Sequence, residues 1–231
     1  MKILVILLLT SFISTSIFSD QNNDPFEKVN KLTHQINDEL DKVVAKPVAN
    51  LYKKVTPDII EIGLSNSISN IEDISIGINN ILQGKIKDGL SDFTRFTVNS
   101  TFGLMGLFDI ASDMGLEKHN EDFGQTLAVW GVPHGPYIVL PVLGPSSLRD
   151  SLSLIPDAIL SPSLLFSDDR TIYGIKGVDL LITRADLLGI DVLIVGDEYL
   201  FMKDAYFQNR EYDIKDGLVE DDFDTFDDWE E

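Results

Sequence analysis

Apolar residues recur every three or four positions along most of the chain, and this spacing predicts a series of amphipathic α-helices. The first helix is expected to begin at Asp24, with Pro25 in its first turn and Glu27 as the capping partner of Asp24. Its apolar face carries Phe26, Val29, Ile36, Leu40 and Val43, and its polar face carries Lys28, Lys31, Asp38 and Asp41. Such a stripe usually packs into a protein core.

Proline and glycine residues are expected to divide this pattern into short helices. Pro47, which follows Lys46, is predicted to break the first helix, and a second helix is predicted after the capping sequence Thr-Pro-Asp at residues 56–58. A third helix is expected from Asn70, with Gly84 as its end. Its isoleucines leave some ambiguity between helix and strand at residues 74–78.

Three further helices are predicted from the same spacing. The first continues through Arg95 to Asn99 and carries Ile86, Leu90 and Phe93. A connection rich in proline and serine follows at residues 161–167, after which Gly189 ends a helix with apolar residues Ile172, Ile175, Val178, Ile182 and Ala185. The last helix is expected to carry Tyr199, Met202 and Tyr206.

Residues 121–150 depart from the helical pattern. The centre of this stretch, residues 137–143, is almost wholly apolar. Turn-forming residues surround and interrupt it: Gly131, Pro133, Gly135, Pro136, Pro141, Gly144 and Pro145. This combination predicts an apolar hairpin between two helices. Ser147 and Asp150 are spaced as in a capping box, so a new helix is expected to start there.

The same stretch resembles a known family. The segments FGQTLAVWGV at 123–132, GPYIVLP at 135–141 and GPSSLRD at 144–150 are similar to the signature of the MlaA/VacJ family, outer-membrane phospholipid-binding proteins of Gram-negative bacteria. Further similar segments are DPFEKVN at Asp24, KPVA at Lys46, NNILQG at Asn79, RFTVNSTFG at Arg95, GLFDIAS at Gly106, RADLLGID at Arg184 and AYFQNR at Ala205. The resemblance covers roughly the whole chain between an N-terminal leader and an acidic tail.

The resemblance implies an all-α, single-domain fold, in which amphipathic helices form a ring in the periplasmic leaflet of the outer membrane. It implies that residues 20–210 form an amphipathic channel, through which phospholipids misplaced in the outer leaflet return to the periplasmic side. Membership would imply three partners: phospholipids, an outer-membrane porin trimer, and a soluble periplasmic lipid carrier of the MlaC type. It implies neither an enzymatic activity nor a cofactor.

The hairpin is the candidate wall or gate of such a channel. The candidate residues are Trp130, Gly131, Gly135, Pro136, Tyr137, Pro141, Gly144 and Arg149. Arg149 and Asp150 have two interpretations: one of them pairs with another helix and holds the base of the hairpin, or Arg149 contacts a lipid phosphate. Trp130 and Tyr137 are either core aromatics or residues placed at the membrane interface.

Both ends of the chain differ from the helical region. Residues 1–19 read as an export signal, cleaved after Ser19 or alternatively after Ser16. The family's lipoproteins carry an acylated cysteine, and this sequence contains no cysteine. Residues 211–231 carry eleven acidic residues against one lysine and are expected to form a disordered tail. Alternatively, Phe223, Phe226 and Trp229 anchor a basic partner.

Charge and composition exclude several classes of function. The net charge of −20 and a pI of about 4.3 argue against nucleic-acid binding. The sequence has neither a GxSxG nor a GxxxxGK[ST] motif, and its three histidines lack zinc-pair spacing. His119, Glu121 and Asp122 could be drawn as a metal site, but a solvated polar loop is the preferred interpretation. The alternatives to transport are a phospholipase or acyltransferase using Ser146 or Ser147, and a structural protein that braces porins.

Overall fold

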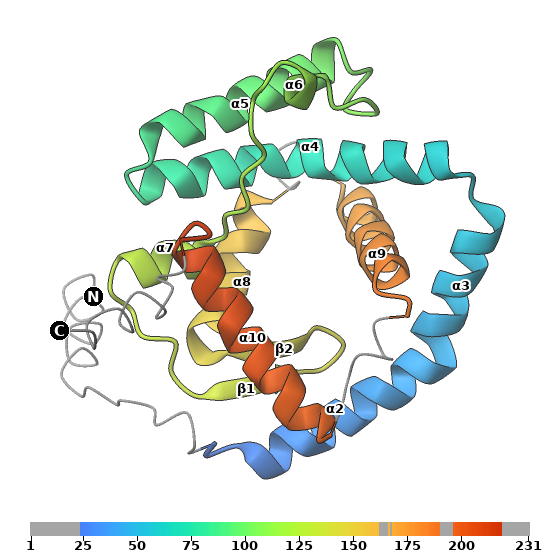
Figure 1. The fold of residues 1–231 in the computed structure, drawn as a ribbon, viewed down its shortest axis with the longest axis vertical. Coiled ribbons are helices and arrows are strands. Elements are labelled where there is room, and N and C mark those ends of the chain that lie inside the picture. The colour runs from blue at the N-terminus through green and yellow to red at the C-terminus, as the bar shows by residue number, and fades with distance from the viewer. Residues whose placement is uncertain (1–23, 162–165, 167, 190–195, 219–231) are drawn as a thin grey trace, which may run out of the picture.

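The computed structural model describes residues 24–161, 166, 168–189 and 196–218. In these ranges the chain is mostly helical, and its helices follow one another around a ring (Figure 1). One arc of the ring contains α2 (Glu27–Leu40), η1 (Asp41–Ala45), α3 (Lys46–Val55), α4 (Asp58–Leu82), α5 (Ile86–Thr101) and α6 (Ile110–Asp113). The other arc contains α7 (Phe123–Val129), β1 (Tyr137–Leu140), β2 (Gly144–Ser147), α8 (Leu148–Leu160) and α10 (Glu198–Ile214). The predicted ring-like, all-α class is confirmed.

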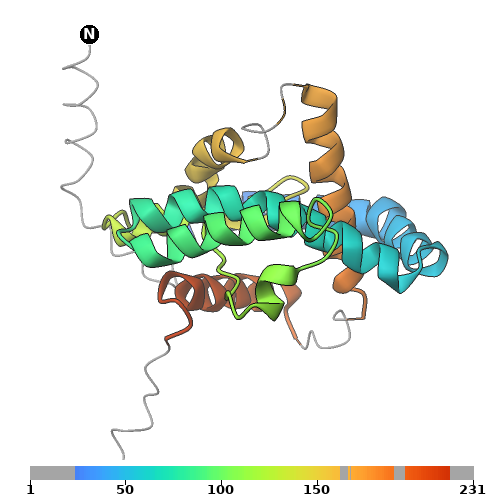
Figure 2. The same ribbon diagram turned by 90° about the horizontal axis from the view of Figure 1, so that it is seen from above.

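Two helices rise from the plane of this ring. Figure 2 places α8 on one side of the plane and α10 on the other, and shows α9 (Asp169–Asp186) extending from the side of α8 across the plane. Helix α9 packs against α3 and α4. None of the described helices combines the length and the apolar character that a membrane-crossing segment needs.

The predicted helix break at Pro47 is wrong. Helix α2 continues through the five-residue π-helix η1 directly into α3, and Pro47 lies in the first turn of α3. The backbone N–H of Lys46 bonds to the carbonyl of Asp41, which is the wider π-type spacing. An α-helix interior has no room for a proline ring beside the carbonyl four residues earlier, and the wider turn relieves that clash. The segment bends without ending.

Helix α4 is a single helix of 25 residues, where the sequence predicted two shorter ones. It begins at Asp58 as expected, but its N-cap is Pro57 and no side chain caps it. It ends as predicted before Gly84, which has a φ of +88°. Residues 74–78 are helical. The Asp24 cap also differs from expectation, because Asp24 accepts a hydrogen bond from the backbone N–H of Phe26 and α2 begins only at Glu27.

The predicted apolar hairpin is present, and its arms are two short β-strands. Strands β1 and β2 pair antiparallel, with Tyr137 opposite Ser147 and Leu140 opposite Gly144. The three residues between the strands include Val142 at a φ of +68°, a left-handed conformation that non-glycine residues seldom adopt. At the other end Ser147 caps α8 and accepts a hydrogen bond from the backbone N–H of Asp150, as predicted.

Three sequence-based predictions lie wholly or partly outside the described residues. They are the export signal at 1–19, most of the connection at 161–167, and the tail with Phe223, Phe226 and Trp229. Helix α10 runs to Ile214, so its last turn includes the first residues of the segment assigned to the acidic tail. Helix α9 ends at Asp186, shortly before Gly189.

The distribution of polarity is inverted relative to an ordinary soluble protein. Among the described residues, buried polar and charged side chains outnumber buried hydrophobic ones. Large aliphatic and aromatic side chains are exposed on nearly every helix. Soluble monomers seldom expose contiguous apolar patches beyond a few hundred Å², so a surface of this kind marks a contact with something apolar.

Candidate functional site

A continuous stripe of exposed apolar side chains runs along α2, η1, α3 and the start of α4. We call it the apolar stripe, and its members are Val29, Leu32, Ile36, Leu40, Val43, Val44, Val48, Leu51, Val55, Ile59 and Ile62. Their spacing of three or four residues places them on one side of the helical path. Transfer of one such side chain from water to a fully buried site stabilises a protein by about 1.5–3 kcal/mol. The isolated chain does not gain this free energy at the exposed positions of the stripe.

The opposite side of α2 is polar and faces the protein. Asn30, His34, Asn37 and Asp41 repeat at helical spacing, and each contacts another element. His34 lies edge-on to Tyr199 of α10 at a ring separation of 6.2 Å. Asp41 accepts two hydrogen bonds from Arg184 of α9, at 2.6 and 2.8 Å. Helix α2 therefore turns its polar face inward and its apolar face outward, the reverse of a helix packed on a hydrophobic core.

The two asparagines of α2 extend the hydrogen-bonding edge of β1. The Asn30 amide donates to the carbonyl of Tyr137 at 2.9 Å and accepts from the N–H of Val139 at 2.9 Å. Asn37 repeats this arrangement with the carbonyl of Leu140 and the N–H of Val142, both at 2.8 Å. Asn30 and Asn37 are two helical turns apart on α2, and this distance matches the length of strand between Tyr137 and Leu140. An otherwise open strand edge is thereby satisfied.

A buried polar network joins α4 to α5. Arg95 of α5 is 2 % exposed and donates two hydrogen bonds of 3.0 Å to the carboxylate of Asp109. Its Nε also lies 3.6 Å from Asp73 Oδ2 on α4. Burial alone would raise the pKa of Asp109, but hydrogen bonds from Ser112, Asn99 and Arg95 lower it to about 2. The network holds this part of the ring together with ionic and amide contacts in place of an apolar interface.

A second buried network joins the base of the hairpin to α10, with Asp150 at its centre. Asp150 accepts hydrogen bonds from Arg149 Nε at 2.8 Å, Ser147 Oγ at 2.9 Å and Tyr206 Oη at 2.5 Å. Arg210 Nε donates to it at 3.1 Å, and the Nη1 and Nη2 atoms of Arg210 donate to Asp122, the N-cap of α7. Burial alone would raise the pKa of Asp150, yet these donors hold that pKa well below its usual range.

The contacts of this network agree with the structural interpretation of Arg149 and Asp150, in which one of the two pairs with another helix. Asp150 pairs with another helix, through Arg210 of α10, and so holds the base of the hairpin. Arg149 is 6 % exposed, and its Nε and Nη2 atoms donate to Asp150. The contact of Arg149 with a lipid phosphate stays a prediction, and it would require those bonds to open.

The two candidate aromatics have different surroundings. Tyr137 is buried at the centre of the largest aromatic cluster, where its ring lies within 6.0 Å of the rings of Tyr199, Tyr206 and Phe207. Burial raises the pKa of its hydroxyl. Trp130 is half-exposed at the end of α7, and its Nε1 donates to the carbonyl of Leu82 at 3.0 Å. Tyr137 is therefore a core aromatic, whereas Trp130 reaches the surface.

The other predicted site residues fall into two groups along the hairpin. Gly135 and Pro136 lie with Arg149 at the base, where the N–H of Leu148 donates to the carbonyl of Pro136 at 3.0 Å. Pro141 and Gly144 lie at the tip, where Gly144 pairs with Leu140. Gly131 has a φ of +86° and follows Trp130. The structure thus brings the base residues together and separates them from the tip.

The sequence analysis missed the residues that fix the hairpin from a distance. The most important are Asn30, Tyr206 and Arg210. A signal for the last two was available, because Tyr199, Tyr206 and Arg210 are seven and four residues apart and share one face of a helix. The repeat of Asn30, His34 and Asn37 on α2 was not predicted either, because the polar face was assigned to Lys28, Lys31, Asp38 and Asp41.

The alternative chemical sites are not assembled in the described part of the chain. Ser147 Oγ bonds to Asp150, a carboxylate whose depressed pKa makes it a weak base. His119 Nδ1 lies 2.7 Å from Asp92 Oδ1, and Glu121 is buried with hydrogen bonds from Gln83 and Lys85. A solvated polar loop was expected at Glu121, and the burial of its side chain shows that this expectation is wrong. Among the described residues no group of three or more His, Asp or Glu side chains could hold a metal ion.

Comparisons with known proteins agree on one family. The profile described as "MlaA lipoprotein" matches residues 22–213. The chain is 32% identical over 211 residues to the "Intermembrane phospholipid transport system lipoprotein MlaA" of Shigella flexneri, covering 89% of this chain and 84% of the relative. An uncharacterized protein of Rickettsia typhi is 31% identical over 196 residues, covering 83% of this chain and 78% of the relative.

A solved structure supports the same assignment. Its title is "Structural basis for maintenance of bacterial outer membrane lipid asymmetry". It aligns with a TM-score of 0.76 and 32% sequence identity, covering 84% of this chain and all of the other. Sequence profile, full-length relatives and backbone geometry therefore agree, and the chain belongs to the MlaA lipoprotein family.

Proposed function

We propose that this protein transports phospholipids and so maintains the lipid asymmetry of the outer membrane. Family membership supplies the general activity, since the relatives from Shigella flexneri and Escherichia coli are named for intermembrane phospholipid transport. The observation that carries the proposal to this chain is the inverted polarity of α2, with its apolar face exposed and its polar face turned toward the protein.

The apolar stripe is the surface that meets the membrane in this proposal. With this surface the ring lies in the periplasmic leaflet of the outer membrane, as an amphipathic helix with one apolar face does at an interface. A polybasic attachment to anionic lipid is disfavoured by the net charge of −20. Contact between the stripe and lipid tails supplies the missing burial, so apolar contact holds the protein without an acylated cysteine in this sequence.

Phospholipids pass through an amphipathic channel framed by the ring in this proposal. A polar passage lowers the cost of moving a charged head group, which would otherwise lose its hydration in hydrocarbon. The hairpin is the proposed wall or gate, with Trp130, Gly131, Gly135, Pro136, Tyr137, Pro141, Gly144 and Arg149 as its residues. Support comes from its attachment, which is rigid at the base through Asp150 and exposed at the tip through Val142 and Leu143.

The proposed route runs from the outer leaflet to the periplasmic side. The partners are a porin trimer in the membrane and a soluble periplasmic carrier that accepts the lipid. In this proposal the energy for net transport comes from outside the chain or from the lipid gradient. No covalent bond is made or broken, in keeping with the use of Ser147 as a helix cap.

Lipid analysis of the purified protein tests this function. The full-length chain is extracted from outer membranes in mild detergent, and bound lipid is identified by mass spectrometry. We expect intact phospholipid in excess over a porin preparation from cells that lack the protein. Lysophospholipid and fatty acid, lost in Ser147→Ala, would identify a lipase, and porin without bound phospholipid would identify a structural brace. Either result would overturn the proposal.

A further inference from the structure

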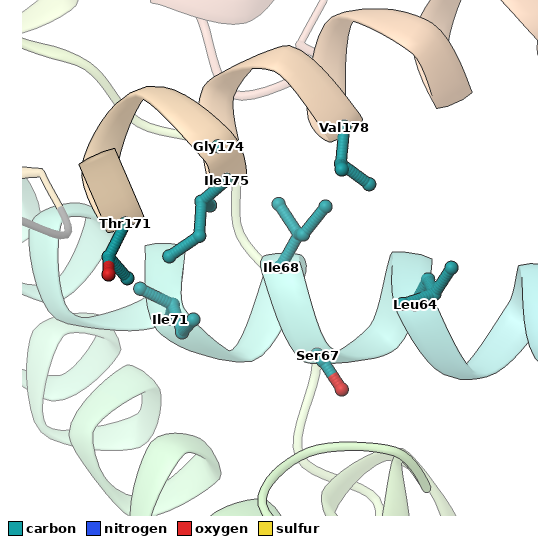
Figure 3. Close-up of a pocket in the computed structure, with 8 residues that line it drawn as sticks. All are labelled: Leu64, Ser67, Ile68, Ile71, Thr171, Gly174, Ile175 and Val178. Atoms are coloured by element: carbon teal, nitrogen blue, oxygen red, sulfur yellow. The ribbon is translucent and has the colours of Figure 1, made fainter.

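An apolar pocket of about 380 Å³ lies between α4 and α9 (Figure 3). Ile68 projects from α4 toward α9, and Ile175 and Val178 project from α9 toward α4. Leu64 and Ile71 extend the wall along α4. The only side-chain polar atoms in the lining are the hydroxyls of one serine and one threonine. None of the lining residues belongs to the hairpin or to either buried network described above.

Gly174 lines the pocket, and the packing of α9 does not require a glycine at this position. It lies in the interior of a helix, where glycine lowers stability relative to alanine. A Cβ atom built at this position meets no heavy atom within 4 Å, so no neighbour demands the missing side chain. The φ of Gly174 is also outside the left-handed region. What the glycine does provide is open space in the pocket wall.

The lining and its surroundings select the chemistry of an occupant. Almost pure hydrocarbon walls fit an alkyl chain, and two hydroxyls are too few to satisfy the polar groups of a peptide or a sugar. The volume lies at the lower end of the range for ligand pockets, which suits one chain and not a whole lipid. Two carboxylates, Glu72 and Asp179, adjoin the lining residues Ile71 and Val178 in sequence. Above about pH 7, where Glu72 has lost its proton, they repel the carboxylate of a free fatty acid, whereas an esterified chain carries no charge there.

We propose that the pocket between α4 and α9 holds one acyl chain of a phospholipid during transport. This inference rests on the proposed function and names a binding site for that function's substrate. The pocket shelters one tail against the ring while the head group occupies a polar environment elsewhere. A larger side chain at Gly174 fills the same space and therefore competes with the tail.

Photolabelling with a defined probe tests this site. The full-length protein in mild-detergent micelles is mixed with a phosphatidylcholine that carries a diazirine within one acyl chain. After illumination, adducts are mapped by mass spectrometry to residues 64–71 and 171–178. Gly174→Phe is the blocking variant. Gly177→Phe is the matched control, because its Cβ position is equally open but it does not line the pocket. Labelling of exposed residues 29–43 on α2 serves as the internal reference.

We expect adducts in both pocket segments of the wild type and of Gly177→Phe, and at least a fivefold loss in Gly174→Phe at equal labelling of α2. Equal pocket labelling in Gly174→Phe would overturn the inference, as would stronger pocket labelling by a diazirine fatty acid than by the phospholipid. Pocket segments without adducts in a wild-type protein that still co-purifies with phospholipid would overturn the site alone. Absence of both would overturn the proposed function as well.

Discussion

Asp150 connects three parts of the chain through a single buried carboxylate. Its carboxylate accepts hydrogen bonds from Ser147 Oγ at the N-cap of α8, from Arg149 at the hairpin base and from Arg210 of α10. A buried ion pair contributes little net stability compared with apolar packing, but removal of one partner leaves an uncompensated charge. The buried guanidinium of Arg149 is paired with this acid, whereas Arg210 shares its charge between Asp150 and Asp122.

Asp150→Asn is therefore expected to destabilise the fold by about 3–5 kcal/mol. The change keeps the shape of the side chain but removes the charge that Arg149 and Arg210 share. Thermal unfolding in mild detergent measures the loss. The control is Asp38→Asn, which removes a partly exposed pair with Lys42 and should cost no more than about 0.5 kcal/mol. Similar melting temperatures for the two variants would contradict the assignment of Asp150 as the centre of the network.

Glu72 makes stability depend on pH in the opposite direction from a salt-bridged acid. Burial, followed by the charge of Asp179, raises its pKa from 4.5 to about 7. Because the folded state binds the proton more tightly than the unfolded state, this group favours folding below about pH 4.5. That contribution is lost as the pH rises through about 7.

Glu72→Gln is accordingly expected to be more stable than the wild type at pH 8, by about 1–3 kcal/mol, and nearly equal to it at pH 4.5. Denaturation of both proteins across this pH range in one detergent gives the difference. Glu117→Gln, at an exposed position, provides the reference for a simple change of net charge. A constant difference between Glu72→Gln and the wild type at all pH values would show that Glu72 ionises normally.

Local residue roles were predictable where they depend on neighbours in sequence. The Ser147 cap follows from the spacing of Ser147 and Asp150, and the left-handed Gly84 follows from the end of a periodic run. The partner of Asp150 could not be found in the same way, because Arg210 is sixty positions away in sequence. Periodicity identifies which residues share a face but not which other face they meet.

At the scale of elements, the sequence predicted the existence of helices better than their limits. Periodicity correctly indicated α5, α9 and α10, and the helix start after Thr56 is confirmed. The break at Pro47 and the separate helix from Asn70 are wrong. A proline stops an α-helix only if the backbone cannot widen locally, and η1 supplies that widening. The arms of the hairpin were too short to show the alternation of a strand, so only the turn was predictable.

Asn30 provides the sharpest test of how α2 is attached to the hairpin. Asn30→Ala leaves the carbonyl of Tyr137 and the N–H of Val139 without their partner in a buried setting. Each unsatisfied group costs about 1–3 kcal/mol, so a loss of about 2–4 kcal/mol is expected. Hydrogen exchange at the Val139 amide should also accelerate strongly.

Asn50→Ala is the matched control for this change. Its amide is exposed and bonds only to the carbonyl of Lys46 in its own helix, so its removal should alter stability by less than about 0.5 kcal/mol. Unchanged protection of the Val139 amide in Asn30→Ala would contradict the attachment of α2 through that side chain.

At the scale of the whole molecule, the ring could not be derived from composition or periodicity. Those patterns assign the apolar face of α2 to a core, whereas the structure exposes that face and turns the side with Asn30, Asn37 and Asp41 toward the protein. An amphipathic helix has the same sequence pattern in either orientation. Resemblance to a family resolved this ambiguity, and it also supplied the ring.

The apolar stripe predicts how the protein is retained in membranes. Ile36→Lys combined with Leu51→Lys places two charges on exposed positions, so the fold should be preserved while lipid contact is penalised. We expect the double variant to be released by an alkaline wash that leaves the wild type in the membrane fraction. Lys28→Ala combined with Lys54→Ala changes charge outside the stripe and should leave retention unchanged. Equal retention of all three proteins would exclude the stripe as the membrane surface.

The most direct test of the central claim is the amount of phosphatidylethanolamine at the surface of intact cells, measured with a membrane-impermeant amine reagent. Cells that lack this protein are compared with the same cells carrying the wild-type gene or the Ile36→Lys, Leu51→Lys variant at equal expression. The account predicts a rise in surface phospholipid without the protein, reversal by the wild type, and little reversal by the variant. An unchanged surface level in cells that lack the protein would contradict transport by this ring.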